Sequence, residues 1–402
     1  MAASIPAMVT PSVLEWARVE AGLPPERAAK RAGVSPDRLL AWERGDVRPT
    51  LRQAQTLARL YHRALSIFFL PEKPALPPLA AEYRRLPGIE PGTESPELRL
   101  AIRILSQRRE TAIALSEELG HPIPVFTLAA HLSEPPEAVG ARLRSALGVT
   151  PQEQLAWRDE WQAWRRWRGA VESVGALVFQ FPKVALQQVR GVTLPQFPLP
   201  VIGINSKETS AAARAFTLMH ELTHLALAAG REEDVALRER RPDPDWQRVE
   251  QFAEEAASHA LIPQETLAVI VQQEAVRQNA WDVPRVQRLA RKFRVTPLAM
   301  ATRLRAAGAL SWDGYRRWKE AWDDYVARLP SRGGGFASPV EKTVGRAGRP
   351  FAQLVLEALD ANRITAVEAC RYLDLRFDHF EKLRGELRGG PGSGREPLDA
   401  GD

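Results

Sequence analysis

The chain has 402 residues, of which 45% are hydrophobic and 26% charged, and this length is enough for two or three folded domains. Its single cysteine, Cys370, excludes an intramolecular disulfide framework and favours a reducing compartment. No apolar run is long enough to cross a bilayer and the N-terminus lacks a secretory signal pattern, so we expect a cytoplasmic protein with no membrane partner. A net charge of +6 permits nucleic-acid binding without requiring it.

The segment from Pro11 to about Leu70 is expected to form five short helices. The second runs from Pro25 to Ala32 with proline in its first turn, and Ser35 can cap the third, from Pro36 to Arg44. The tight turn Gly33-Val34-Ser35 separates these two helices. Helix, short glycine turn and helix is the arrangement of the DNA-binding helix-turn-helix, whose second helix enters the major groove.

This segment resembles the XRE (Cro-repressor-type) helix-turn-helix. The residues that carry the resemblance are Ala28-Ala29, Gly33-Val34-Ser35, Leu39, Trp42-Glu43-Arg44-Gly45 and Pro49-Thr50. It implies that Ser35, Pro36, Asp37 and Arg38 face the groove. Only Arg38 is a good donor to bases or phosphates there, and Asp37 would repel phosphate. The alternative is an interaction module that keeps the fold and docks a partner protein.

Between this segment and residue 174 we expect a linker followed by helices. Residues 70–78 are proline-dense, which predicts an extended, semi-rigid linker, and Pro96 to Leu119 is expected to be one long helix. Tryptophans then recur at helical spacing, at Trp157, Trp161, Trp164 and Trp167. With the arginines among them they could stack on a nucleic acid, but such a stripe is more often part of a core, and we favour the core interpretation.

Three short strands are expected near the middle of the chain. They are Ala176 to Phe181, Arg190 to Leu194 and Val201 to Asn205, which are rich in β-branched and aromatic residues. An edge strand of such a sheet could hold an extended peptide by backbone pairing. The sequence leaves open which strand lies at that edge.

The pattern His-Glu-x-x-His follows at His220, Glu221 and His224. Histidines at i and i+4 share one face of a helix about 6 Å apart, so both imidazoles can reach one zinc-sized cation. Glu221 follows the first histidine, where its carboxylate can take a proton from the attacking water. The flanking residues favour a buried helix that ends near Gly230. The alternative, a surface helix with two unrelated histidines, is disfavoured by these apolar neighbours.

A third metal ligand is expected from the next helix, because a catalytic zinc keeps three protein ligands and one open position. That helix, Trp246 to Leu261, offers Glu250, Glu254 and Glu255. Glu250 and Glu254 are four residues apart and share a face, whereas Glu255 is rotated by about 100° from Glu254. Spacing alone leaves Glu250 and Glu254 as alternatives.

The stretch from Ile202 to Pro263 resembles the ImmA/IrrE family of metallopeptidases. Ile202-Gly203-Ile204-Asn205 matches the family's Ile-x-Ile-Asn strand, and Arg214 to His224 matches its Arg-x-Phe-Thr-Leu-x-His-Glu-x-x-His helix. In register, Glu250 falls on the family's third metal ligand. Glu254 and Ala256 replace the usual asparagine and phenylalanine, which leaves the ligand intact but puts the packing of the second helix in doubt.

The resemblance implies a metal-dependent endopeptidase that cuts a regulatory protein, typically a helix-turn-helix repressor, with Zn2+ or Mn2+ as the metal. On this reading His220, His224 and Glu250 bind the metal and Glu221 is the general base. Arg214 and His259 could stabilise an oxyanion, but a structural role is expected for each. The alternative is a DNA-binding transcriptional regulator whose metallopeptidase-like domain senses a metal or ligand without cutting. Glu221 disfavours it, because a sensor needs no general base.

The last third of the chain is expected to be helical. Helices are predicted at Val286 to Phe293, Pro297 to Ala307 and Trp312 to Leu329, followed by a flexible break at 331–335. A small three-helix unit follows, with helices at Phe351 to Leu359, Thr365 to Leu373 and Asp378 to Leu387. It could be a second DNA-binding element, but we favour a packing or dimer module, with Cys370 as a small buried residue.

These expectations give a mainly α protein with a small β-sheet, in five parts. The parts are an XRE-type helix-turn-helix domain (9–72), a linker and helical region (73–174), an ImmA/IrrE-like metallopeptidase domain of α+β, zincin-like fold (175–310), a C-terminal helical region (311–388) and a disordered tail (389–402).

Overall fold

The computed structural model describes residues 5–74, 94–230, 243–273, 281–328 and 338–388. The chain divides into two units, Met1–Ile104 and Leu105–Asp402. Helix α6 (Pro96–Leu119) contributes residues 96–104 to the first unit and 105–119 to the second. The predicted linker beyond residue 74, the break at 331–335 and the tail at 389–402 lie outside the described residues. The finer five-part division stays a prediction.

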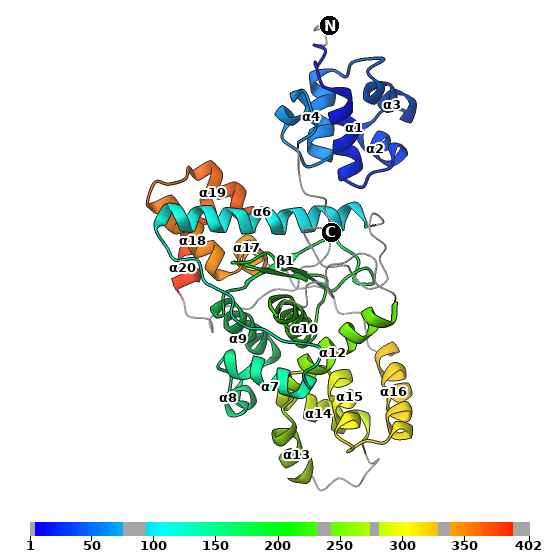
Figure 1. Cartoon of the computed structure of the whole chain (residues 1–402), viewed down its shortest axis with the longest axis vertical. Helices are drawn as coiled ribbons and strands as arrows, with labels where there is room; N and C mark the ends of the chain where they lie inside the picture. The colour runs from blue at the N-terminus through cyan, green and yellow to red at the C-terminus, as the bar shows by residue number, and fades with distance from the viewer. Residues whose placement is uncertain (1–4, 75–93, 231–242, 274–280, 329–337, 389–402) are drawn as a thin grey trace. The chain divides into compact units, whose positions relative to one another are not determined.

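Short helices form the first unit (Figure 1). They are α1 (Pro11–Glu20), α2 (Pro25–Ala32), α3 (Pro36–Arg44), α4 (Leu51–Leu60) and the 3-10 helix η1 (Leu65–Phe69). The Ser35 hydroxyl accepts a hydrogen bond from the Arg38 N–H and caps α3, as predicted, while Gly33 ends α2 at a φ of 70°, which glycine adopts without strain. The fifth predicted helix is present as the 3-10 helix η1. That segment closes with tighter i→i+3 bonds, such as Ile67 N to Ala64 O, as very short helices do.

A buried ion pair joins α1 to α3. The Nε and Nη2 atoms of Arg18 donate to the two carboxylate oxygens of Glu43 at 2.8 and 2.9 Å, and Nη1 donates to the carbonyl oxygen of Leu23. These hydrogen bonds to Glu43 raise the pKa of Arg18. The paired geometry allows both charges to be buried in this unit, whose core includes Leu39 and Trp42.

A three-stranded sheet forms the centre of the second unit, with the strand order β1-β3-β2. Its strands are β1 (Leu177–Phe181), β2 (Gly191–Leu194) and β3 (Val201–Asn205), which confirms the predicted strands to within one residue. β1 runs parallel to β3 and β2 antiparallel to it. Helix α10 (Ala211–Ala229) packs against β2 and β3, and Figure 1 shows it on the opposite side of the sheet from α17 (Pro339–Ala347). Of the two edge strands, β2 makes the more extensive contact with α10, while β1 reaches it through Gln180.

Helices make up the rest of the second unit. They are α7 (Pro136–Ala146), α8 (Pro151–Ala156), α9 (Glu160–Ser173), α12 (Asp243–Leu261), α13 (Gln264–Gln273), α14 (Val283–Phe293), α15 (Pro297–Ala306), α16 (Trp312–Ala327), α18 (Arg349–Asp360), α19 (Ala366–Leu373), η2 (Phe377–His379) and α20 (Phe380–Arg388). One apolar core extends from Phe126 in the chain to Trp318 and includes side chains of α7, α9, α10, α12, α14 and α15. The residues before the sheet therefore belong to the same core as the helix that carries the histidines.

The tryptophan stripe belongs to this core. Trp157, Trp164 and Trp167 are buried and Trp161 packs against them in the same cluster, which confirms the core interpretation. The four residues do not lie on one helix, however. Trp157 follows the end of α8 in an extended conformation, and the Asp159 carboxylate accepts a hydrogen bond from the Gln162 N–H to begin α9.

The C-terminal helices pack onto the sheet. The Phe351 ring of α18 meets the Phe179 ring of β1 edge to face at a centroid distance of 5.5 Å, and α17 also contacts β1. This agrees with a packing module. The prediction of three helices is wrong in one respect, because α17 precedes them and begins with a capping box between Ser338 and Glu341. Cys370 in α19 is only half-buried.

Close packing and buried hydrogen bonds fix helix α12. A Cβ atom at Gly140 of α7 would lie 2.4 Å from the Ala256 carbonyl oxygen, so glycine lets the two helices approach closely. At the end of α12, Arg144 donates to the carbonyl oxygen of Ala260 and Gln154 to that of Leu261, where no intrahelical donors remain. Burial lowers the pKa of Arg144 to about 10. These contacts hold the helix that brings Glu250 to the histidines.

Candidate metal centre

Helix α10 carries the two histidines on one face. It is apolar nearly all round and fifteen of its nineteen residues are buried, as expected of a helix inside a core. The Ser210 hydroxyl caps its start and Gly230 follows its last residue, as predicted. The Nε2 atoms of His220 and His224 lie 3.0 Å apart, and His224 is only 1% exposed.

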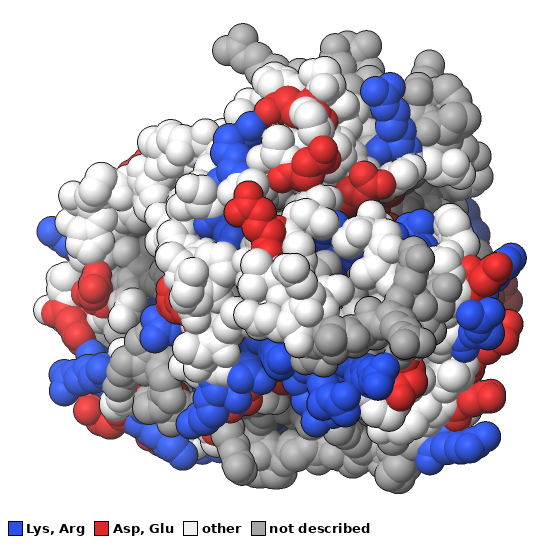
Figure 2. Space-filling model, turned by 90° about the horizontal axis from the view of Figure 1, so that it is seen from below, with Lys and Arg blue, Asp and Glu red and all other residues white. Residues whose placement is uncertain are grey.

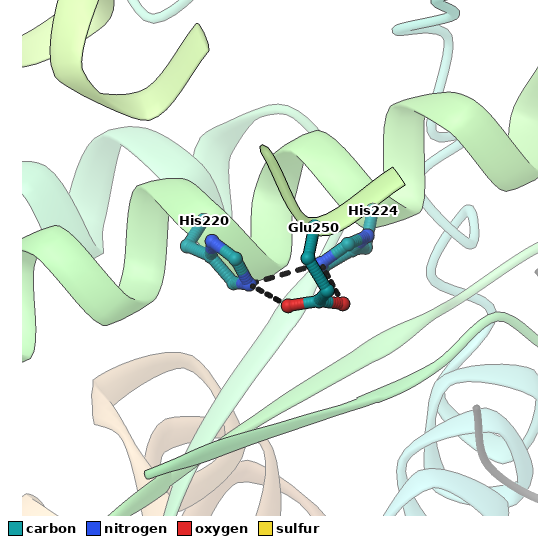
Figure 3. Close-up of side chains that lie close together, drawn as sticks. All are labelled: His220, His224 and Glu250. Atoms are coloured by element: carbon teal, nitrogen blue, oxygen red, sulfur yellow. Dashed lines mark hydrogen bonds and ion pairs between the residues drawn. The ribbon is translucent and has the colours of Figure 1, made fainter. Parts of the chain in front are cut away.

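Glu250 of α12 completes a group of three. Its Oε2 lies 3.3 Å from Nε2 of His220 and its Oε1 lies 3.5 Å from Nε2 of His224. Within the described residues this is the group of His, Cys, Asp and Glu side chains that could hold a metal ion, and its ligand atoms all lie within 4.8 Å of one another. Figure 3 shows the three side chains converging from two helices. Glu254 and Glu255 are exposed and do not belong to this group. Of Glu250 and Glu254, the two alternatives for the third ligand, the structure therefore favours Glu250.

Glu221 lies on the side of α10 that faces β2. Its side chain is 7% exposed, and its Oε2 accepts a hydrogen bond of 2.6 Å from the Thr193 hydroxyl. Thr193 is a residue of the site that is not predicted from the sequence. It lies 28 residues before Glu221, and nothing in the local pattern of β2 indicates that it reaches the carboxylate.

The two residues considered for the oxyanion have structural partners. Buried Arg214 donates to the backbone oxygens of Glu208 and Ser206 and to Gln180, which ties the start of α10 to the end of β3. The Nδ1 atom of His259 lies 3.0 Å from a guanidinium nitrogen of Arg303, and His259 is not in the group of three. Burial, followed by the charge of Arg303, lowers the pKa of His259. These contacts agree with the structural roles expected for both.

The residues expected to contact DNA lie together in the first unit. Ser35 caps α3, and Pro36, Asp37 and Arg38 form its first turn, with all four exposed. This is the end of a recognition helix that reaches base edges in helix-turn-helix proteins. The structure therefore presents these four side chains together on the surface of the unit.

Comparison with known families decides what these two units are. The model of a family described as the IrrE N-terminal-like domain, Peptidase M78, matches residues 172–305, and a helix-turn-helix family model matches residues 14–68. The chain carries an IrrE N-terminal-like domain. The matched residues of that metallopeptidase-like domain include β1 to β3, α10 and most of α15. The second match shows that residues 14–68 of the first unit form an XRE-type helix-turn-helix domain. A search of curated proteins found no match.

The geometry of the IrrE-like domain fits a divalent metal. Four ligands placed tetrahedrally about 2.0–2.1 Å from zinc are roughly 3.3 Å from one another. The two Nε2 atoms lie 3.0 Å apart, and each lies 3.3 or 3.5 Å from a different oxygen of the Glu250 carboxylate, so the individual contacts are close to that spacing. Two imidazole nitrogens and a carboxylate are also the donor types that zinc accepts.

Across the described residues, no helix is long and apolar enough to span a membrane.

Proposed function

We propose that the chain is a metal-dependent endopeptidase that cleaves a regulatory protein of the repressor type, and that its helix-turn-helix domain brings it to DNA or to a partner. The observation that carries this proposal is the convergence of His220, His224 and Glu250 with their ligand atoms within 4.8 Å. A general base beside these ligands supports cleavage rather than metal storage or sensing.

Each residue of the centre has a distinct part in the proposed reaction. His220, His224 and Glu250 would hold Zn2+ or Mn2+, which when bound supplies a Lewis acid at the scissile carbonyl. Glu221 takes the proton of the attacking water and delivers it to the leaving amine, because a carboxylate beside the reacting atoms can act first as base and then as acid. The burial of Glu221 excludes solvent from one side of this carboxylate.

The outer edge of β2 is suited to hold the substrate chain. In the described part of the sheet, no strand pairs with this edge. The Asn205 N–H donates to the Arg190 carbonyl oxygen, so alternation along the antiparallel ladder turns the N–H and C=O groups of Gly191 and Thr193 outward. Thr193 also touches Glu221, which places this edge beside the proposed base. An extended segment of a substrate protein could pair here.

A cleavage assay tests this function directly. The full chain, loaded with Zn2+ or Mn2+, is incubated with a panel of helix-turn-helix repressor proteins, and fragments are identified by mass spectrometry. We expect cleavage of one repressor by the wild type and by Glu254→Gln, which changes an exposed carboxylate of α12. Glu221→Gln should keep the metal and lose at least about 100-fold in rate, as expected for removal of a general base. Equal rates for Glu221→Gln and wild type would contradict the proposal.

DNA binding is tested in the same preparations. Exposed basic residues are not confined to the helix-turn-helix domain, because α14 carries Arg288, Arg291 and Lys292 and no acidic residue. Figure 2 shows Lys and Arg in a band across the face of the molecule seen from below. The test therefore compares wild type with Arg38→Ala. Loss of one phosphate contact should weaken binding and reduce the slope of log affinity against log salt by about 1.

The alternative function is a transcriptional regulator whose metallopeptidase-like domain is a sensor. If Glu221→Gln keeps the full regulatory activity of the wild type, this alternative replaces the proposed peptidase function.

A further inference from the structure

We propose that Thr193 is a positioning residue for the proposed general base, and that Gly191 and Thr193 of β2 together form a slot that fixes the Glu221 carboxylate. This inference rests on the proposed peptidase function and adds to it the residues that set the direction of the base. Both residues come from a strand that lies against the helix carrying the metal ligands.

The hydrogen bond to Thr193 is short and buried. The Thr193 hydroxyl lies 2.6 Å from Oε2 of Glu221 and 3.3 Å from the backbone carbonyl oxygen of the same residue. A hydroxyl has one hydrogen to donate, and the shorter distance assigns it to the carboxylate. Thr193 is 2% exposed and Glu221 7%, so water reaches this bond poorly. A buried hydrogen bond to a carboxylate is stronger than one between neutral groups.

Gly191 forms the other wall of the slot. A Cβ atom at this position would lie 2.8 Å from both Cγ and Oε1 of Glu221 and 2.7 Å from Cγ2 of Thr217. These distances are shorter than any normal carbon contact, so every larger side chain here would push against the carboxylate. Residues two apart on a strand point to the same face, which is why Gly191 and Thr193 both face α10. Gly191 leaves room for Oε1 of Glu221, and Thr193 donates a hydrogen bond to its Oε2.

The strand that bears these residues is held in place. Every residue of β2 is in register with one of β3, and Asn205 at the end of β3 donates to the carbonyl oxygens of Val184 and Val189 in the loop before β2. The β-branched Thr193 has few rotamers on such a fixed backbone. A base held in this way starts the reaction in its working orientation, and a misplacement of 1 Å can cost about 100-fold in rate.

The experiment compares Thr193→Val, Thr193→Ser and Thr343→Val in the full, metal-loaded chain. Valine keeps the shape of threonine and removes the hydroxyl, whereas serine keeps it. Thr343 of α17 is a matched control, because it is equally buried and its hydroxyl contacts the Leu373 backbone instead. We expect Thr193→Val to lose about 10- to 100-fold in kcat with an unchanged KM, Thr193→Ser to recover most of that loss, and Thr343→Val to match the wild type.

Two readouts besides activity accompany the kinetics. The absorption spectrum of the Co2+-substituted chain should be the same in Thr193→Val as in the wild type, because Thr193 does not touch the ligands. The infrared carboxylate band assigned to Glu221 by comparison with Glu221→Gln should shift in Thr193→Val and not in Thr193→Ser. Wild-type kcat in Thr193→Val, an altered Co2+ spectrum, or an unshifted band would each overturn the positioning role. If the wild type cleaves nothing, the peptidase proposal fails, and the infrared band still tests the contact.

Discussion

The two carboxylates at the centre of the second unit have different surroundings. Glu221 is enclosed between α10 and β2 and is bonded to Thr193, whereas Glu250 is partly exposed and faces the two imidazoles. These different neighbours suit the two roles that we propose, Glu221 as the general base and Glu250 as a metal ligand. His259, which lies nine residues beyond Glu250 on the same helix, has a different environment beside Arg303.

Stability should depend on pH through His259. Burial and the charge of Arg303 lower the pKa of His259 in the folded chain below its ordinary value of 6.5, so the unfolded chain binds a proton first as the pH falls. The stabilising contribution is fully present above pH 6.5 and decreases as the pH falls through 6.5 toward the lowered pKa. We expect His259→Gln, which keeps an acceptor for Arg303, to lose less stability than the wild type between pH 8 and pH 5.5.

Urea unfolding of the metal-free chains at these two pH values gives the measurement. The other histidines titrate alike in both proteins, so their contributions cancel in the comparison. An equal loss of unfolding free energy in wild type and His259→Gln would show that the environment of His259 has no such effect.

Single residues also show what the sequence could and could not predict. His220 and His224 were found because i, i+4 spacing is a local property of a helix, and the Ser35 cap is equally local. The choice of Glu250 over Glu254 needed either the family resemblance or the packing of α12 against α10. Thr193 was missed because its contact with Glu221 depends on how a strand lies on a helix 28 residues away. No spacing rule encodes such a contact.

At the scale of elements, the crossing of α7 and α12 determines where Glu250 lies. Gly140→Ala would place a methyl group 2.4 Å from the Ala256 carbonyl oxygen and 2.9 Å from the Ala260 backbone nitrogen. Backbone atoms cannot turn away as a side chain can, so the helices must separate. We expect a loss of about 1–3 kcal/mol in the free energy of unfolding, which is typical of overpacking.

The matched control for this change is Gly169→Ala in α9. A Cβ atom at Gly169 meets no neighbour within 4 Å, so alanine should stabilise the helix by about 1 kcal/mol through its higher helix propensity. Chemical denaturation of both variants measures the difference. If Gly140→Ala is as stable as Gly169→Ala, the close approach of α7 and α12 is not a constraint on the fold.

Elements were predicted best where a local signal marks both ends. The three strands and α6 match their predicted ranges to within a residue, because each is bounded by turn residues or proline. The spacing of the tryptophans suggests a single helical stripe, but the Asp159 cap begins a new helix within it, and the Ser338 capping box begins α17 where no helix is predicted. In both places the cap, and not the periodicity of apolar residues, marks where the helix begins. The periodicity of apolar residues also does not predict that α10 packs on one side of the sheet and α17 on the other.

At the scale of the whole molecule, the two candidate sites belong to different units of the chain. The exposed first turn of α3 lies in the first unit, and the group of His220, His224 and Glu250 lies in the second. Substitutions in independent sites that share no partner usually have additive effects. The two proposed activities should therefore be separable, with Arg38→Ala affecting DNA affinity and Glu221→Gln affecting cleavage.

The most direct test of the account is the number of divalent ions that the purified full chain binds. After metal removal and titration with Zn2+, we expect one ion per chain in the wild type and in Glu254→Gln, and a loss of at least about 100-fold in affinity in Glu250→Gln and in His224→Ala. A wild-type chain that binds no ion, or a Glu250→Gln chain that binds as tightly as the wild type, would contradict the central claim that these three side chains form a metal centre.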